Sequence, residues 1–212
     1  MTEDQIRDLI AAQRHQLADT LSALPEEAWD APTLCDGWRV REVIAHVAME
    51  FRYPTARFLW HFALAGFNFH RLNNRRATAD ARDLSSAELT ASIRDNVHHP
   101  WKPPGTGYAS TLTHETVHAL DALVPLGVDW SVPEPTVRAV LDAWDVEHGR
   151  KYFGVDLTGV RLCADDLDWT VGEGKPLTGH ASDLLLVLAG RKLPPARLTG
   201  PAAPRFTAQS SS

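Results

Sequence analysis

The sequence contains few cysteines, and none in a spacing typical of a structural metal site. Cys35 and Cys163 are the only cysteines among 212 residues, and no C-x-x-C pair occurs. A chain of this length can bury a sizeable core without covalent cross-links, and disulfides are rare in the cytoplasm. We therefore expect two free thiols, and cysteine-rich zinc sites are excluded.

Long apolar runs and an excess of positive charge are also missing. The most apolar stretch, FLWHFALAGF at 58–67, is far shorter than the about 20 residues of a membrane-spanning helix. The first residues, MTEDQIRDLI, carry acids where a secretory signal needs a basic stretch. A net charge of -6 and a pI of about 5.9 provide no basic footprint for nucleic acid. We expect a soluble, cytoplasmic protein with neither nucleic acid nor membrane as partner.

Amphipathic helical segments fill the first three quarters of the chain. Apolar residues recur at helical spacing, which predicts helices over 3–23, from about 40, and over 51–76, 86–98, 109–125 and 133–150. Connections of moderate length favour antiparallel packing of neighbouring helices. The sequence thus predicts a helical bundle over residues 1–152.

The pattern changes in the last quarter of the chain. Apolar and polar residues alternate over 160–164 and again over 167–171, with Asp-Asp between them, which predicts a hairpin. A short apolar helix is expected over 180–192. The fold class is therefore mainly α, with a small α+β domain over 153–200 and a flexible, proline-rich tail over 201–212.

Residues 114–118 read HETVH, the H-E-x-x-H string of zinc metallopeptidases, with Glu115 in the position of the base. The extended form of that motif fails, because Asp121 occupies its glycine position and Val124 its third histidine position. Glu147 is the only downstream glutamate in a helical setting. The residues before 150 read as helical, whereas such peptidases usually hold substrate on a sheet edge. A metallopeptidase is one alternative.

A different metal site uses the same two histidines. His114, His118 and Asp121 stand at i, i+4 and i+7, on one face of the predicted helix. Two imidazoles one turn apart can bind one metal ion, and a bundle supplies further ligands from a facing helix. His46 on the second helix is the candidate. Three histidines leave an open coordination position, as in catalytic zinc sites, and also suit nickel, copper and iron.

Four segments, in order, resemble the mycothiol-dependent maleylpyruvate isomerase family, within the DinB-like metal-binding superfamily. They are LPEEAWDAPTLCDGWRVREVIAHVAM, HETVHALDALVPLG, LDWTVGEG and GHASDLLLVLAGRKLPPARLTG, and the resemblance covers almost the whole chain. It implies a DinB-like antiparallel four-helix bundle and a divalent metal, typically Zn²⁺, held by His46, His114 and His118. The characterised isomerase has a glutamate in place of His114. The alternative ligand set is therefore His46, Glu115 and His118, but the i, i+3 spacing of Glu115 and His118 matches the family less regularly than the i, i+4 spacing of His114 and His118.

The resemblance also implies roles for two further residues. Asp121 matches an acidic residue one turn beyond the last ligand, where it would orient a ligand or the thiol. Arg191 matches an arginine at the end of the last helix, where it would bind the cofactor or an anionic substrate and steady a developing enolate. Cys35 precedes the ligand helix, but the sequence shows no adjacent base, so we do not predict a nucleophile there.

The activity that the resemblance implies is metal-dependent thiol chemistry. A low-molecular-weight thiol, mycothiol, would bind at the open metal position and attack a small electrophile. The outcome would be thiol transfer or cis–trans isomerisation, so the enzyme would be a transferase or an isomerase. The alternative from another class is a metal-binding module without turnover. We expect a monomer or a homodimer.

Overall fold

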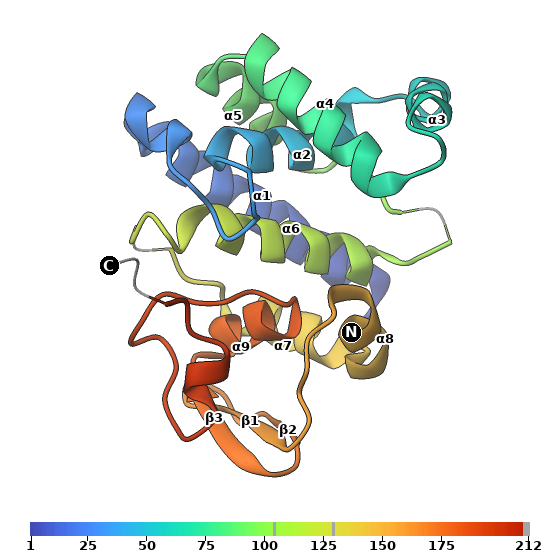
Figure 1. The fold of residues 1–212 in the computed structure, drawn as a ribbon. Coiled ribbons are helices and arrows are strands. Elements are labelled where there is room, and N and C mark those ends of the chain that lie inside the picture. Colours follow the sequence, from blue (N-terminus) through green and yellow to red (C-terminus); the bar gives the residue numbers. More distant parts are fainter. Residues whose placement is uncertain (104, 129, 210–212) are drawn as a thin grey trace. The chain divides into compact units, whose positions relative to one another are not determined.

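The computed structural model describes residues 1–103, 105–128 and 130–209, with their side chains except those of residues 55, 147, 148 and 150. The chain forms two compact units, Met1–Trp130 and Ser131–Ser212 (Figure 1). The division comes earlier than the predicted one after residue 152. Within the second unit, the helices that follow Ser131 pack against the last helix of the chain.

The N-terminal unit is built around a four-helix bundle. Its helices are α1 (Glu3–Ala23), α2 (Val40–Arg52), α5 (Ser86–Arg94) and α6 (Tyr108–Leu123). Both α1 and α2 contact both α5 and α6, and α4 (Phe69–Asp83) packs on the outside of α2. A short 3-10 helix, η1 (Glu26–Asp30), also contacts α2. This arrangement agrees with the predicted bundle.

Helix α2 is buried on nearly all sides, so its polar side chains also lie inside the bundle. Its core contacts come from apolar residues that are at most 1% exposed, including Val43, Ile44 and Val47. Alanines on facing helices, such as Ala48 and Ala119, let the backbones approach closely. As a result every residue from Glu42 to Glu50 is buried, including the polar ones.

The predicted helix over 51–76 is interrupted twice in the structure. The chain leaves α2 at Arg52, and Pro54 precedes a separate helix, α3 (Thr55–Leu64). Proline lacks an N–H and disfavours helical geometry in the residue before it. After α3, Gly66 has a φ of +66°, a left-handed conformation that ends the helix.

The C-terminal unit combines three helices with a small sheet. They are α7 (Glu134–Ala143), α8 (Val146–Phe153), α9 (Ala181–Leu188), β1 (Val160–Ala164), β2 (Thr170–Gly172) and β3 (Lys175–Gly179). The strand order is β2-β1-β3, and α9 packs on β1 and β3. The antiparallel pairing of β1 with β2 confirms the predicted hairpin, whereas the parallel strand β3 was not predicted.

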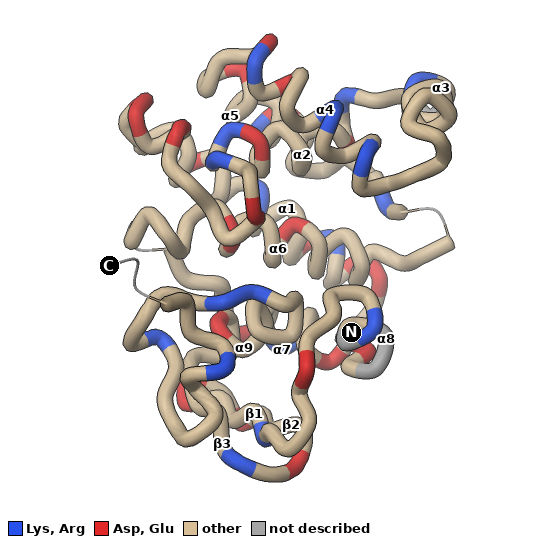
Figure 2. Tube along the Cα trace, viewed as in Figure 1, with Lys and Arg blue, Asp and Glu red and all other residues tan. Residues whose placement is uncertain are grey.

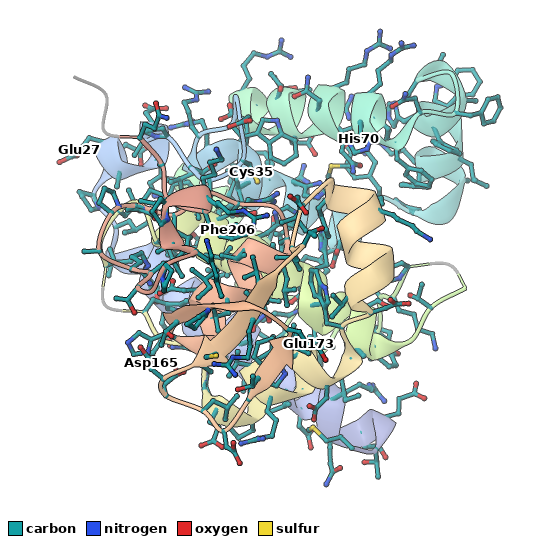
Figure 3. The ribbon with its side chains drawn as sticks, turned by 60° about the horizontal axis from the view of Figure 1, so that its bottom comes forward. Glu27, Cys35, His70, Asp165, Glu173 and Phe206 are labelled. Carbon is teal, nitrogen blue, oxygen red and sulfur yellow. The ribbon has the colours of Figure 1, made fainter. Side chains whose placement is uncertain are left out.

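The predicted flexible tail is instead packed up to Ala208. Phe206, labelled in Figure 3, is only 5% exposed, and Ala208 N–H donates to the Leu193 carbonyl at 2.8 Å. Arg205 binds the Asp156 carboxylate at 2.9 Å. An apolar anchor and an ion pair therefore hold a segment whose composition resembles that of a disordered tail. Residues 210–212 lie outside the described part of the chain.

Candidate metal centre

Three histidines predicted as ligands meet between α2 and α6. His46 lies on α2, while His114 and His118 lie on successive turns of α6. The ring centroid of His46 is 5.0 Å from that of His114 and 4.9 Å from that of His118. One nitrogen from each ring can be chosen so that all three lie within 4.8 Å of one another. The bundle thus brings together residues that are far apart in the sequence.

The cluster has a buried side and an accessible side. His46 is 9% exposed and packs under the ring of Trp38, with centroids 5.2 Å apart. The side chains of His114 and His118 are 27% and 14% exposed. His114 and His118 are therefore the solvent-accessible members of the cluster.

The electrostatics of His46 favour an uncharged imidazole. Burial, and then repulsion from His118 and His114, hold its pKa well below the ordinary value. Its Nε2 lies 3.0 Å from Nε2 of His114, and its Nδ1 is buried without a hydrogen-bond partner. Buried polar atoms without partners are rare. A neutral imidazole beside two others is the donor set that zinc prefers, so these residues fit a divalent metal.

Glu50 is a buried carboxylate at this cluster that the sequence reasoning missed. It lies one helical turn after His46, and its Oε1 is 2.8 Å from Nδ1 of His114. The distance is that of an ion pair, but the angle is not that of a hydrogen bond. Burial lowers the pKa of His114, yet the Glu50 carboxylate outweighs this, so the pKa is raised. The i, i+4 spacing from His46 was the signal that could have identified it.

Asp121 holds the other α6 histidine. Its carboxylate is fully buried, and Oδ2 lies 3.1 Å from Nδ1 of His118. When Nδ1–H donates to a carboxylate, the lone pair of Nε2 is left for a metal, the usual arrangement around histidine ligands. This is the geometry of an orienting residue, and that role of Asp121 stays a prediction.

Cys35 lies beside Asp121, although no neighbour for it was visible in the sequence. Its Sγ donates to Oδ2 of Asp121 at 3.0 Å and lies 3.8 Å from Nδ1 of His118 (Cys35 is labelled in Figure 3). The backbone N–H of Leu34 donates to the carbonyl of Asp121 at 3.1 Å. The loop before α2 is therefore tied to α6 at the residue that orients His118.

Glu115 is paired with Arg14 of α1. Its carboxylate receives two hydrogen bonds from Nε of Arg14 and one from Nη2, the shortest at 2.6 Å. This interaction occupies the carboxylate within the bundle core. It argues against Glu115 as the base of a metallopeptidase and against Glu115 as a replacement for His114. The side chain of Glu147, the downstream candidate, lies outside those that the structure describes.

Arg191 belongs to the C-terminal unit and follows α9. Its Nη1 donates to the Ala189 carbonyl at 3.0 Å. Together with Lys192 and Arg205 it lines a cavity of about 320 Å³ in that unit, beside the rings of Phe153 and Phe206. Asp156, which pairs with Arg205, lines it too, so the lining is aromatic and on balance cationic, which suits an anionic organic group. The role of Arg191 in cofactor or substrate binding stays a prediction.

Comparisons with known proteins agree with the fold. Residues 10–99 match the family model described as the mycothiol maleylpyruvate isomerase N-terminal domain. A crystal structure of the mycothiol-dependent maleylpyruvate isomerase has a TM-score of 0.62 and 17% identity, covering 96% of this chain and 94% of that chain. A histidine-to-alanine mutant of that isomerase has a TM-score of 0.61 and 16% identity, with the same coverage. No curated protein matches in sequence. These likenesses confirm the predicted mainly α, DinB-like fold.

Proposed function

We propose that the chain is a metal-dependent enzyme using a low-molecular-weight thiol, with mycothiol as the thiol, on the basis that residues 10–99 match the model of the mycothiol maleylpyruvate isomerase N-terminal domain. The proposal of a metal site rests on the convergence of His46, His114 and His118 between two helices of the bundle. The match to the family model is what supports a low-molecular-weight thiol as cosubstrate. The substrate would be a small electrophile.

The metal ligands would be the imidazoles of His46, His114 and His118. Asp121 would hold His118 through a hydrogen bond to Nδ1, and Glu50 would act on His114 through the charge of its carboxylate, 2.8 Å from Nδ1. Zinc is the candidate, since it accepts nitrogen ligands and an open fourth position. When bound, such an ion lowers the pKa of a ligating thiol so that thiolate is available near neutral pH.

Glu50 also bears on the charge of the proposed site. Three neutral histidines leave a divalent ion with its full charge, whereas a carboxylate ligand would remove one unit. Glu50 is buried beside His114, so its negative charge acts at short range and with little screening by water. Glu50 would thus place a negative charge beside the ligands, whereas a glutamate ligand would bring the same charge into direct contact with the metal.

The chemical step would be attack of the thiolate on an electrophilic carbon. A C–S bond forms, and the electron pair of the attacked double bond moves to an adjacent carbonyl oxygen as an enolate. Protonation of the enolate gives the thioether product of transfer. Alternatively, rotation about the former double bond takes place in the unprotonated enolate; its electron pair then re-forms the double bond, the same C–S bond breaks, and the geometric isomer and the thiolate are released. Arg191 would steady the enolate by bidentate hydrogen bonds.

Metal analysis of purified variants tests the ligand set. We expect one divalent metal per chain in the wild type and loss of that metal in His46→Ala and His118→Ala. His15→Ala is the matched control, because His15 is an exposed histidine on α1, and it should keep the metal. Full retention of metal in His46→Ala would overturn the proposed site.

Thiol consumption tests the activity separately. The metal-loaded protein is mixed with mycothiol and a panel of small electrophiles, including cis-enediones and maleyl compounds, and loss of free thiol and change of isomer are followed. A rate that disappears with His46→Ala supports the enzyme. Stoichiometric metal without any thiol-dependent reaction would instead identify a metal-binding module without turnover.

A further inference from the structure

Helix α3 presents an apolar stripe to solvent. Its members recur at i, i+3, i+4, i+7 and i+8 and continue into the next turn; they are Ala56, Leu59, Trp60, Ala63, Leu64 and Phe67, all exposed. Trp60 is 65% exposed, Leu59 and Leu64 are each 57%, and Phe67 is 73%. Such a stripe normally faces a protein core. Contiguous exposed apolar residues of this kind mark an interaction site.

The opposite face of α3 is already anchored. Phe62 lies against Phe69 of α4 with ring centroids 4.4 Å apart, and Phe58 lies 6.2 Å from the same ring. Figure 1 shows α3 beside one end of α4 and apart from the four helices of the bundle. Phe58 and Phe62 thus form the side of α3 that meets α4, and the ring of Phe67 lies edge-on to Phe62 with centroids 5.5 Å apart.

Phe67 adds a strained residue to the stripe. Its φ is +58°, directly after Gly66 at +66°. A bulky residue with positive φ is a true outlier, whereas glycine and asparagine adopt this conformation readily. At 73% exposure Phe67 contributes little to the core of the chain itself. An apolar ring kept in a strained position at the surface is consistent with use in an external contact.

Positive charge surrounds the stripe. Residues 51–79 contain five arginines and no aspartate or glutamate, although the chain has 27 acidic residues and a net charge of -6. Figure 2 shows this absence of acidic residues on α3 and the adjoining turn of α4. Arg57, Arg71 and Arg75 are exposed. In the described part of the chain none of the three forms a salt bridge.

These arginines stand at both ends of the stripe. Arg57 lies in the first turn of α3, with its guanidinium 4.7 Å from the ring centroid of Tyr53. At the other end, Arg75 donates to the Leu64 carbonyl at 3.3 Å, and Arg71 lies beside Gly66. The α3 surface, defined as the six apolar residues and these three arginines, is thus an apolar strip with a cationic border.

We propose that the α3 surface binds an anionic lipid bilayer. Trp, Phe and Leu would enter the boundary between headgroups and acyl chains, and the arginines would contact lipid phosphates, as in helices that lie in the membrane plane. The ten residues of α3 are too few to span a bilayer, and no helix among the described residues is long and apolar enough to do so. This goes beyond the proposed enzyme and revises the sequence-based expectation of no membrane partner.

Two other occupants fit the α3 surface less well. A second copy of the chain would bring Arg57, Arg71 and Arg75 towards the same residues of its partner, so like charges would meet across the contact. A nucleic acid strand could stack on Trp60, but the aliphatic Leu59 and Leu64 offer nothing to bases or phosphates. A lipid surface uses both the aliphatic side chains and the positive charge.

Vesicle co-sedimentation of the full-length protein tests the proposal. We expect binding to phosphatidylcholine vesicles that contain phosphatidylglycerol, weaker binding as salt is raised, and little binding to phosphatidylcholine alone. Replacing Arg57, Arg71 and Arg75 by Gln should weaken binding about fivefold per residue, because each surface arginine contributes to that extent. Replacing Arg82, Arg138 and Arg161 by Gln removes the same charge elsewhere and should have a much smaller effect.

Phe67→Asn separates lipid contact from folding. Asparagine suits the left-handed backbone, so the unfolding temperature should stay the same or rise, while vesicle binding should fall several-fold. Trp60→Ser should also reduce binding. The proposal is overturned if anionic vesicles do not bind the wild type or if both variants bind as the wild type does. It is equally overturned if light scattering finds a dimer that these substitutions dissociate, without vesicle binding.

Discussion

Arg14 and Glu115 form a buried salt bridge across the bundle, with Nη2 of Arg14 2.6 Å from Oε1 of Glu115 and both side chains 1% exposed. Arg14 also donates to the carbonyls of Asn96 and His99, at 2.9 and 3.0 Å. This pairing separates the glutamate of HETVH from the two histidines of the same string. Glu115 is thus engaged by α1, while His114 and His118 meet His46 of α2.

Glu115→Gln should destabilise the fold while leaving the histidines in place. Removing one partner leaves the Arg14 charge buried without its counterion, which costs about 3 kcal/mol or more. Urea denaturation of the metal-free protein measures this loss. Metal content should stay at the wild-type level. Loss of metal without loss of stability would instead place Glu115 among the ligands.

Replacing both members of this pair supplies the control. The double variant Arg14→Met with Glu115→Leu removes both charges and keeps apolar volume, which is often neutral or stabilising. We expect its free energy of unfolding to lie above that of Glu115→Gln. A double variant as unstable as the single one would contradict the view that an unpaired charge causes the loss.

Asp121→Asn should weaken metal binding about 10- to 100-fold, the usual effect of losing the carboxylate that orients a histidine ligand. Competition with a chelator that reports zinc binding measures the affinity. Thermal unfolding of the metal-free protein distinguishes a local effect from loss of the fold. Unchanged zinc affinity in Asp121→Asn would show that this carboxylate does not orient the ligand.

Cys35 should act through Asp121. Cys35→Ala removes the Sγ donor to Oδ2 of Asp121, so we expect a smaller loss of zinc affinity than in Asp121→Asn. Cys35→Ser keeps a donor and should restore most of the affinity. Cys163→Ala, which removes the other cysteine, is the matched control and should have no effect. Equal losses in the Ala and Ser variants would show that sulfur itself is needed.

Glu50→Gln should change the titration of His114 in the metal-free protein. The Glu50 carboxylate raises the pKa of His114 against the lowering effect of burial, so its removal should shift that pKa downward. Histidine NMR resonances followed against pH measure the shift. Zinc affinity should fall as well, because a buried negative charge next to the site is lost. An unchanged His114 titration would contradict the interaction.

Much of the secondary structure follows from local patterns. The capping box of Thr2 with Gln5 at the start of α1 and the alternating residues of β1 and β2 are visible in the sequence and are present in the structure. Strand β3 escaped prediction, because Pro176 and two flanking glycines hide its pattern and its partner is the parallel strand β1.

Helical periodicity, a property of the local sequence, determined that His114 and His118 share one face of α6 and that Asp121 follows on it. The tertiary structure decided which distant groups meet that face. Packing of α2 against α6 supplied His46 and Glu50, the loop before α2 brought Cys35 to Asp121, and α1 placed Arg14 against Glu115. The physical reason is range: residue spacing along a helix depends on the backbone of that helix alone, whereas contacts between helices depend on how the whole core packs.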